Sequence, residues 1–214
     1  MTFQGWPVES LEFYDGLEAD NSKTYWAAHK AVYESAVLAP MEALLAELED
    51  EFGDGKIFRP YRDIRFSADK SPYKTAIGAT LARGGYVQLS AEGLAAGCGY
   101  YVMASDQIER YRAAVAEERT GEELRRVLAK VGKHAGIEIV VRETLRTAPR
   151  GYAKDHPRLD LLRNKDLIAW QRWPVEPWLE TPAAKDRVAE FFRAARPLVA
   201  WLDDNVGRTT MPGR

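Results

Sequence analysis

The chain has 214 residues, of which 46% are hydrophobic and 29% are charged, and its formal net charge is -2. These values are typical of a folded globular protein, and they exclude a largely disordered or collagen-like chain. The single cysteine, Cys98, excludes an intrachain disulfide and a cysteine-based zinc site.

The N-terminal quarter has helical periodicity. A short helix is predicted over residues 7–17, and Asn21 is expected to close it in the left-handed conformation. Ser22 can cap a second helix over residues 22–37, and Pro40 fits the first turn of a third helix that ends at Gly53. We therefore expect three amphipathic helices with their acidic residues outward.

After the third helix the period of the hydrophobic pattern changes to two. Four strands are predicted, over residues 57–67, 75–82, 86–90 and 98–105. The short Gly and Pro turns between them favour an antiparallel meander. Pro60 cannot donate to a ladder, so the first strand is expected to be an edge or to carry a bulge.

The C-terminal half alternates helices and isolated strands. Capping-box patterns at Asp106 and Thr120 predict helices near residues 106–119 and 121–133. Strands over residues 137–145 and 165–173, a short helix after Asp155 and a terminal helix from Thr181, containing Pro197, complete the series.

The order of these elements predicts an α+β fold. We expect one antiparallel sheet of about five or six strands, covered by amphipathic helices. Residues 1–207 should form a single α+β domain, and residues 208–214 a flexible tail. No segment approaches the ~20 apolar residues that a membrane span needs, and no secretion signal is evident, so we expect a cytoplasmic protein.

Charge is distributed unevenly along the chain. Residues 1–55 hold twelve acids and two bases, whereas residues 56–74 hold six bases and two acids. A second basic stretch, residues 142–165, holds seven bases and three acids. The acidic helices and basic segments could neutralise one another across the fold, or the basic segments could attract an anion.

The strongest candidate site is the segment Arg-Asp-Ile-Arg-Phe-Ser-Ala-Asp-Lys-Ser-Pro-Tyr-Lys-Thr at residues 62–75. If Ile64 and Phe66 face the core, strand alternation sends Asp63 and Arg65 to the opposite face. Guanidinium, ammonium and phenol groups so close together suit a phosphate or a carboxylate. The predicted ligand-binding residues are Arg62, Asp63, Arg65, Ser67, Lys70, Tyr73, Lys74 and, from the second basic stretch, His156. The alternative is an ion-pair network of Arg62, Asp63 and Arg65 that ties the sheet to the acidic helices, with Ser67 and Asp69 serving the turn.

Other kinds of site have weaker support. The three histidines, His29, His134 and His156, lie far apart without carboxylates at ligand spacing, so we expect no metal site and no cofactor. Aromatic residues among the cations of residues 58–74 fit the loose pattern of a single-strand nucleic-acid platform. The pI near 6.0 argues against a dedicated nucleic-acid binder.

Several motifs together resemble a conserved bacterial and fungal family known as a domain of unknown function. They are the segment at residues 62–75, Asn-Ser-Lys-Thr-Tyr-Trp at 21–26, Gly-Cys-Gly-Tyr-Tyr at 97–101, and Pro-Arg-Gly-Tyr followed by Asp-His-Pro at 149–157. The resemblance implies a compact α+β protein and no particular activity.

The leading hypothesis is a soluble protein that binds a small anionic ligand, as a binding protein or as an enzyme, with the heads of Arg65 and Lys74 facing one hollow. The alternative is a non-enzymatic protein-interaction module with a basic sheet edge. Weak nucleic-acid binding is the third hypothesis.

Overall fold

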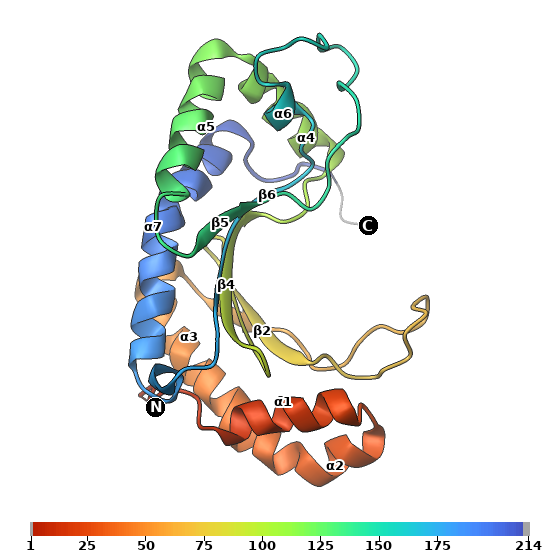
Figure 1. Ribbon diagram of the computed structural model, residues 1–214, viewed down its shortest axis with the longest axis vertical. Coiled ribbons are helices and arrows are strands. Elements are labelled where there is room, and N and C mark those ends of the chain that lie inside the picture. Colours follow the sequence, from red (N-terminus) through yellow and green to blue (C-terminus); the bar gives the residue numbers. More distant parts are fainter. Residues whose placement is uncertain (1, 212–214) are drawn as a thin grey trace. The chain divides into compact units, whose positions relative to one another are not determined.

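The computed structural model describes residues 2–211, which fall into two compact units (Figure 1). The first comprises Met1–Ala96 and Arg172–Glu190, and the second comprises Gly97–Gln171 and Phe191–Arg214. The single-domain organisation predicted from the sequence stays a prediction.

The first unit begins with the expected helices α1 (Glu9–Ala19), α2 (Lys23–Val32) and α3 (Ala39–Phe52). The Ser22 side chain accepts a hydrogen bond from the Tyr25 backbone N–H at 3.1 Å, so the predicted cap of α2 is confirmed. The prediction for Asn21 is wrong, because among the described residues only glycines have positive φ. The Asn21 side chain instead bonds to a distant loop, as described below.

The second and third helices are not separated by a loop. A π-helical segment, Tyr33–Leu38, joins α2 to α3 directly. Pro40 lacks an N–H and its ring would crowd the carbonyl one turn earlier, so a regular α-helix cannot run through it unchanged. The wider π turn is a known way to absorb such an interruption within one helical rod.

The strands are β1 (Gly55–Ile57), β2 (Ala76–Leu81), β3 (Gly85–Ser90), β4 (Gly93–Tyr100), β5 (Ile137–Val140) and β6 (Leu167–Trp173). They form one antiparallel sheet in the order β1-β2-β3-β4-β6-β5, which confirms the predicted fold class and its central meander. The strand predicted over residues 98–105 starts earlier, at Gly93, and ends at Tyr100.

The first predicted strand, over residues 57–67, is mostly wrong. Strand β1 ends at Ile57. Beyond it, the pairing continues only in pieces, as a backbone hydrogen bond from the Phe58 N–H to the Gly78 carbonyl and as an isolated bridge between Tyr61 and Tyr73. Phe66 is not a core residue, because 96% of it is exposed. Residues 58–75 instead form a long loop between β1 and β2. In Figure 1 this loop projects from the strands like an arm.

The sheet of the first unit is apolar on the side that meets the helices. Strand β3 alternates buried and half-buried residues, with Val87 and Leu89 buried. Helix α3 packs against β1 and β2. On the other face of β3 lie Tyr86, Gln88 and Ser90, which are only half-buried. This second face supplies part of the candidate site.

The second unit contains α4 (Ser105–Ala116), α5 (Glu118–Val131), α6 (Leu159–Leu162) and β5, close to the predicted positions. The predicted caps are wrong. Glu117, not Thr120, caps α5 by accepting from the Arg119 and Thr120 N–H groups. Before α4, the Gln107 side chain accepts from the Ala104 N–H.

A 3₁₀ turn, Pro177–Glu180, precedes the long terminal helix α7 (Ala183–Asn205), which contains Pro197. Beyond it, Thr209 and Thr210 hydrogen-bond to the carboxylate of Asp106. Residues 212–214 of the predicted flexible tail lie outside the described residues. Between residues 2 and 211 no helix combines the length and apolar character needed to cross a bilayer.

Candidate functional site

The loop formed by residues 58–75 has an ordered base. Tyr61 pairs with Tyr73 across an antiparallel bridge. On either side of that bridge, the Arg62 N–H donates to the Pro72 carbonyl at 2.9 Å and the Lys74 N–H donates to the Pro60 carbonyl at 2.8 Å. The two prolines cannot donate, but here they act as acceptors, which suits a short two-stranded segment rather than a full sheet strand.

This base is fastened to the helices. The Asn21 side chain donates to the Tyr73 carbonyl and accepts from the Tyr73 N–H, both at 3.1 Å. The Tyr73 ring stacks on the Trp26 ring of α2, with centroids 4.3 Å apart and planes 6° apart. Two backbone bonds and a buried aromatic contact therefore fix the position of the residue next to Lys74.

Side chains in the distal part of the loop, residues 63–71, bond to other groups of the same segment or to Arg62. Arg62 makes an ion pair with Asp69, and Arg65 donates to both carboxylate oxygens of Asp63 at 3.0 and 2.7 Å. The Lys70 ammonium donates to the Ile64 carbonyl at 3.0 Å. The Arg65 guanidinium holds the pKa of Asp63 below its usual value, and Arg62 with Ser71 does the same for the pKa of Asp69.

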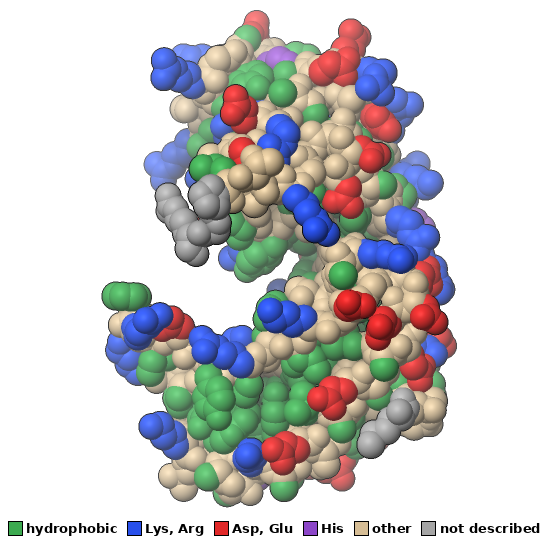
Figure 2. Space-filling model, turned by 180° about the vertical axis from the view of Figure 1, so that it is seen from behind, with side chains coloured by type: hydrophobic (Ala, Val, Ile, Leu, Met, Phe, Trp, Pro, Cys, Tyr) green, Lys and Arg blue, Asp and Glu red, His purple; other side chains and the backbone are tan. Residues whose placement is uncertain are grey.

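The alternative predicted from the sequence, an ion-pair network, is therefore present in a local form. These pairs close the loop upon itself and do not tie it to the acidic helices. In Figure 2, Lys and Arg side chains gather on the segment that projects from the first unit, together with hydrophobic surface at its end.

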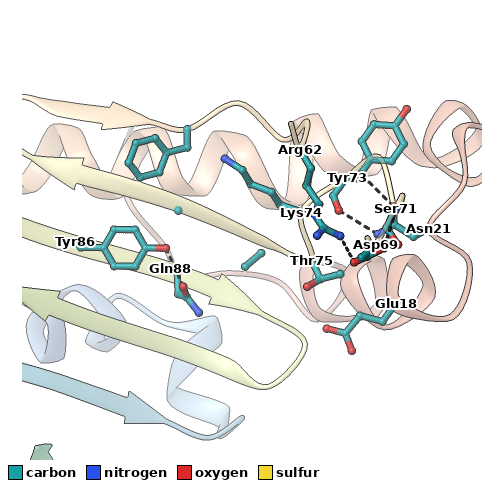
Figure 3. A pocket seen from close by; sticks show the side chains of 13 residues that line it. Glu18, Asn21, Arg62, Asp69, Ser71, Tyr73, Lys74, Thr75, Tyr86 and Gln88 are labelled. Carbon is teal, nitrogen blue, oxygen red and sulfur yellow. Dashed lines mark hydrogen bonds and ion pairs between the residues drawn. The ribbon is translucent and has the colours of Figure 1, made fainter. Parts of the chain in front are cut away.

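A hollow of about 560 Å³ lies where the base of the loop meets the open face of the sheet (Figure 3). Arg62, Asp69 and Ser71 stand together on its loop side, and Tyr86 and Gln88 lie over the strands. Its other lining residues are Glu18, Asn21, Phe58, Tyr73, Lys74, Thr75, Ala76 and Gly78. All of them belong to the first unit.

Lys74 differs from the other cations of the loop. Its ammonium lies over the Phe58 ring, 5.3 Å from the centroid, and it pairs with no carboxylate among the described residues. Burial of the ammonium, and then the nearby Arg59 guanidinium, lower the pKa of Lys74 from the ordinary lysine value. A partly buried cation beside a second cation is a favourable place for an anion.

The structure brings together only part of the predicted site. Arg62, Tyr73 and Lys74 line the hollow, whereas Asp63, Arg65, Ser67 and Lys70 are not among its lining residues. Ser67 instead donates its N–H to the Ile64 carbonyl in a turn. The heads of Arg65 and Lys74 do not meet at this hollow.

His156 belongs to the second unit, where its Nδ1 accepts a hydrogen bond from the Arg158 N–H at 3.1 Å. Arg158 itself is buried and donates to the Val115 and Ala116 carbonyls at the end of α4 and to Glu122 of α5. This part of the second basic stretch therefore stabilises a helix end. Among the described residues no cluster of His, Cys, Asp or Glu is arranged to hold a metal ion.

Sequence reasoning missed three relevant residues, Asn21, Arg59 and Gln88. Asn21 was assigned to a helix end and Gln88 to a strand, and nothing local in the sequence links either to the loop. A signal for Gln88 did exist in its partner strand. Gly78 lies directly opposite Gln88, and a glycine inside a strand often marks a place where other atoms approach closely.

Comparison with known proteins gives a family and no activity. A solved structure of a conserved hypothetical protein from Pyrococcus furiosus is similar over 80% of this chain and 96% of its own, with 12% identity and a TM-score of 0.39. No curated protein matches the chain. Residues 9–201 match the family of conserved hypothetical proteins called DUF2461, and the chain therefore belongs to that family.

Proposed function

We propose that the hollow at the base of the loop binds a small anionic ligand through a phosphate or carboxylate group. The observation that supports this most is the state of Lys74. It is a half-buried ammonium that lines a hollow beside Arg59 and has no carboxylate partner among the described residues. An anion there would relieve the repulsion between the two cations and replace water lost by burial.

Arg62 is a secondary contact in this proposal. It lines the same hollow, but Asp69 already occupies its guanidinium. Arg62 can share remaining N–H donors with a ligand, since guanidinium has five. The charged contact of largest effect is therefore Lys74.

The test is a thermal-shift screen of phosphorylated and carboxylated metabolites, followed by titration of any hit. A ligand at ~100 times its dissociation constant adds about 2.7 kcal/mol of apparent stability. Lys74→Met should remove that shift. Lys70→Met is the matched control, because Lys70 is a loop cation bonded to the Ile64 carbonyl and absent from the lining. Equal shifts in both variants would contradict the proposal.

A protein-interaction role is the second candidate. One observation favours it, the almost full exposure of Phe66 on a loop segment held by its own ion pairs. Such a residue suits contact with a partner better than contact with a small ligand. Phe66→Ser would then abolish binding to the partner and leave the anion-dependent shift unchanged.

Nucleic-acid binding is a weaker candidate, since the loop cations other than Lys74 and Arg59 are largely occupied within the loop. It predicts salt-sensitive retention on an oligonucleotide that Arg65→Ala weakens. Absence of retention at low salt would reject it. The cytoplasmic location stays a prediction.

A further inference from the structure

A second hollow, of about 320 Å³, lies on the same unit and shares one residue with the first. It is lined by Gln88 and Ser90 of β3, by Glu92 and the first three residues of β4, and by Arg172, Trp173 and Pro174. Gln88 lines both hollows, so the two adjoin at this residue. Together they offer a ligand more length than an isolated phosphate would use.

Small residues of β2, Ala76 and Gly78, line the first hollow beside the shared Gln88. In the β2–β3 register, Gly78 lies opposite Gln88 and Ala76 lies opposite Ser90. A Cβ added to Gly78 would lie 2.6 Å from the Tyr86 hydroxyl and 3.2 Å from two of its ring carbons. The Tyr86 ring therefore lies across Gly78, and Figure 3 shows it face-on above the strands.

Gln88 presents hydrogen-bond donors at the junction. The Tyr86 hydroxyl donates to Gln88 Oε1 at 2.8 Å, an arrangement that directs the amide Nε2 away from Tyr86. Among the described residues no acceptor is bonded to Nε2. The Gln88 residue is half-buried. An amide group held in this way can donate to a hydroxyl or carbonyl oxygen of a bound molecule.

Each hollow is lined by as many carboxylates as cations, although no carboxylate of the described residues pairs with Lys74. The first is lined by the cations Lys74 and Arg62 and the carboxylates Glu18 and Asp69, and in the second Arg172 lies 3.9 Å from Glu92. A ligand with many negative charges would meet carboxylates as well as cations. A ligand with one anionic group and an otherwise uncharged, hydroxyl-bearing body fits this set of groups better.

We infer that the ligand is a phosphorylated or carboxylated sugar, which extends from Lys74 across Tyr86 and Gln88 toward the second hollow. This inference rests on the proposed function, because Lys74 binds the anionic group. The apolar C–H face of a sugar ring can lie on the Tyr86 ring. Its hydroxyls can accept from Gln88 Nε2.

Isothermal titration calorimetry of the full chain with inorganic phosphate, a hexose phosphate and the same unphosphorylated hexose tests this inference. The hexose phosphate should bind at least about tenfold more tightly than phosphate. Gln88→Leu should remove most of that gain, so that the hexose phosphate then binds little more tightly than phosphate does. Lys74→Met should weaken binding of both inorganic phosphate and the hexose phosphate.

The results separate the two proposals. Equal affinities for phosphate and hexose phosphate, unaffected by Gln88→Leu, would overturn the sugar inference and leave anion binding intact. Failure of both phosphorylated probes to bind would overturn both proposals, as would equal binding of hexose and hexose phosphate insensitive to Lys74→Met. Gln88→Met, which keeps about the same side-chain length and adds no charge but lacks the N–H donors, repeats the test if Gln88→Leu unfolds, and must likewise reduce hexose phosphate binding.

Discussion

The base and the distal part of the loop at residues 58–75 contain the same kinds of residue but differ in how their charges are satisfied. In the distal part, Arg65 and Lys70 bond to Asp63 and to the Ile64 carbonyl. At the base, Lys74 lies over Phe58 beside Arg59 without a carboxylate partner among the described residues. A dense run of cations in the sequence therefore divides into cations that bond within the distal part of the loop and Lys74, which has no such partner.

The two regions also differ in their attachment. Asn21 and Trp26 fasten Tyr73 at the base through two hydrogen bonds and a stacked ring pair. The distal part depends on exposed ion pairs, which contribute little stability in water. A binding site needs side chains held in place, and the base meets that requirement better than the distal part.

The largest expected effect comes from detaching the base with Asn21→Ala. This change leaves the Tyr73 N–H and carbonyl without their partners next to a buried ring, and should lower the free energy of unfolding by about 2 kcal/mol. Chemical denaturation measures it. Phosphate binding should weaken too, because Lys74 follows Tyr73 directly.

Asn21→Asp provides the matched control. It keeps the oxygen that accepts from the Tyr73 N–H but loses the donor to the Tyr73 carbonyl. We expect a loss of stability smaller than that of Asn21→Ala. If Asn21→Ala were as stable as the wild type, the base would not be fastened in the way described.

A smaller effect, of opposite sign, is expected for Asp69→Asn. It releases Arg62 from its ion pair at the edge of the hollow, so affinity for phosphate should rise several-fold. Calorimetric titration measures the change. Asp63→Asn is the control, since it releases Arg65, which is not a lining residue, and should leave the affinity unchanged.

Mild acid should not reproduce the effect of Asp69→Asn. Arg62 and Ser71 hold the pKa of Asp69 well below its ordinary value of 3.8. The stabilising ion pair is lost only as pH falls through that lowered pKa. At pH 3.8 an aspartate of ordinary pKa would be half protonated, whereas the Asp69 carboxylate is still charged, so a rise in phosphate affinity of the wild type on acidification to that pH would contradict this assignment.

The pH dependence of binding should report on Lys74. Its pKa lies below the ordinary value of 10.5, because of burial and then Arg59, so phosphate affinity should begin to fall at a lower pH than for an exposed lysine. Arg59→Gln should shift this fall to higher pH by removing the like charge. Lys74→Arg should abolish it over the same range, since guanidinium stays charged.

The same lowered pKa has a consequence for stability. The folded state holds the Lys74 proton less tightly than the unfolded state does, so the unfolded chain binds more protons between the lowered pKa and 10.5. The contribution of Lys74 to stability should therefore increase as pH rises through that window. Denaturation of the wild type and Lys74→Met across this range tests the sign, and a decrease relative to the variant would contradict it.

The sequence predicted most of the fold because the relevant signals are local. Alternation on β3 and the Ser22 cap depend on residues close together in the chain. The segment from Ile64 to Phe66 misled the same reasoning, because alternation indicates a strand only when a partner strand is available. Strand β2 starts at Ala76, and its pairing with β1 extends no further along the chain than Ile57, so residues 62–71 have no partner in the sheet.

The candidate site was less predictable than the fold. Lys70 and Lys74 are equivalent in sequence terms, and only the tertiary structure distinguishes a lysine bonded to a carbonyl from one beside Arg59. Asn21 is 52 residues from Tyr73, so the clamp between them has no local signal. The cation-rich segment was recognisable in the sequence, but which partner each cation bonds to depends on the tertiary structure.

The smallest expected effect is that of Arg65→Ala. Arg65 pairs with Asp63 on an exposed part of the loop, where solvent screens the interaction, and it does not line the hollow. Neither the melting temperature nor phosphate affinity should change measurably. If Arg65→Ala weakened phosphate binding as much as Lys74→Met, the distal part would share the site, as the sequence predicted, and the distinction between the two regions would fail.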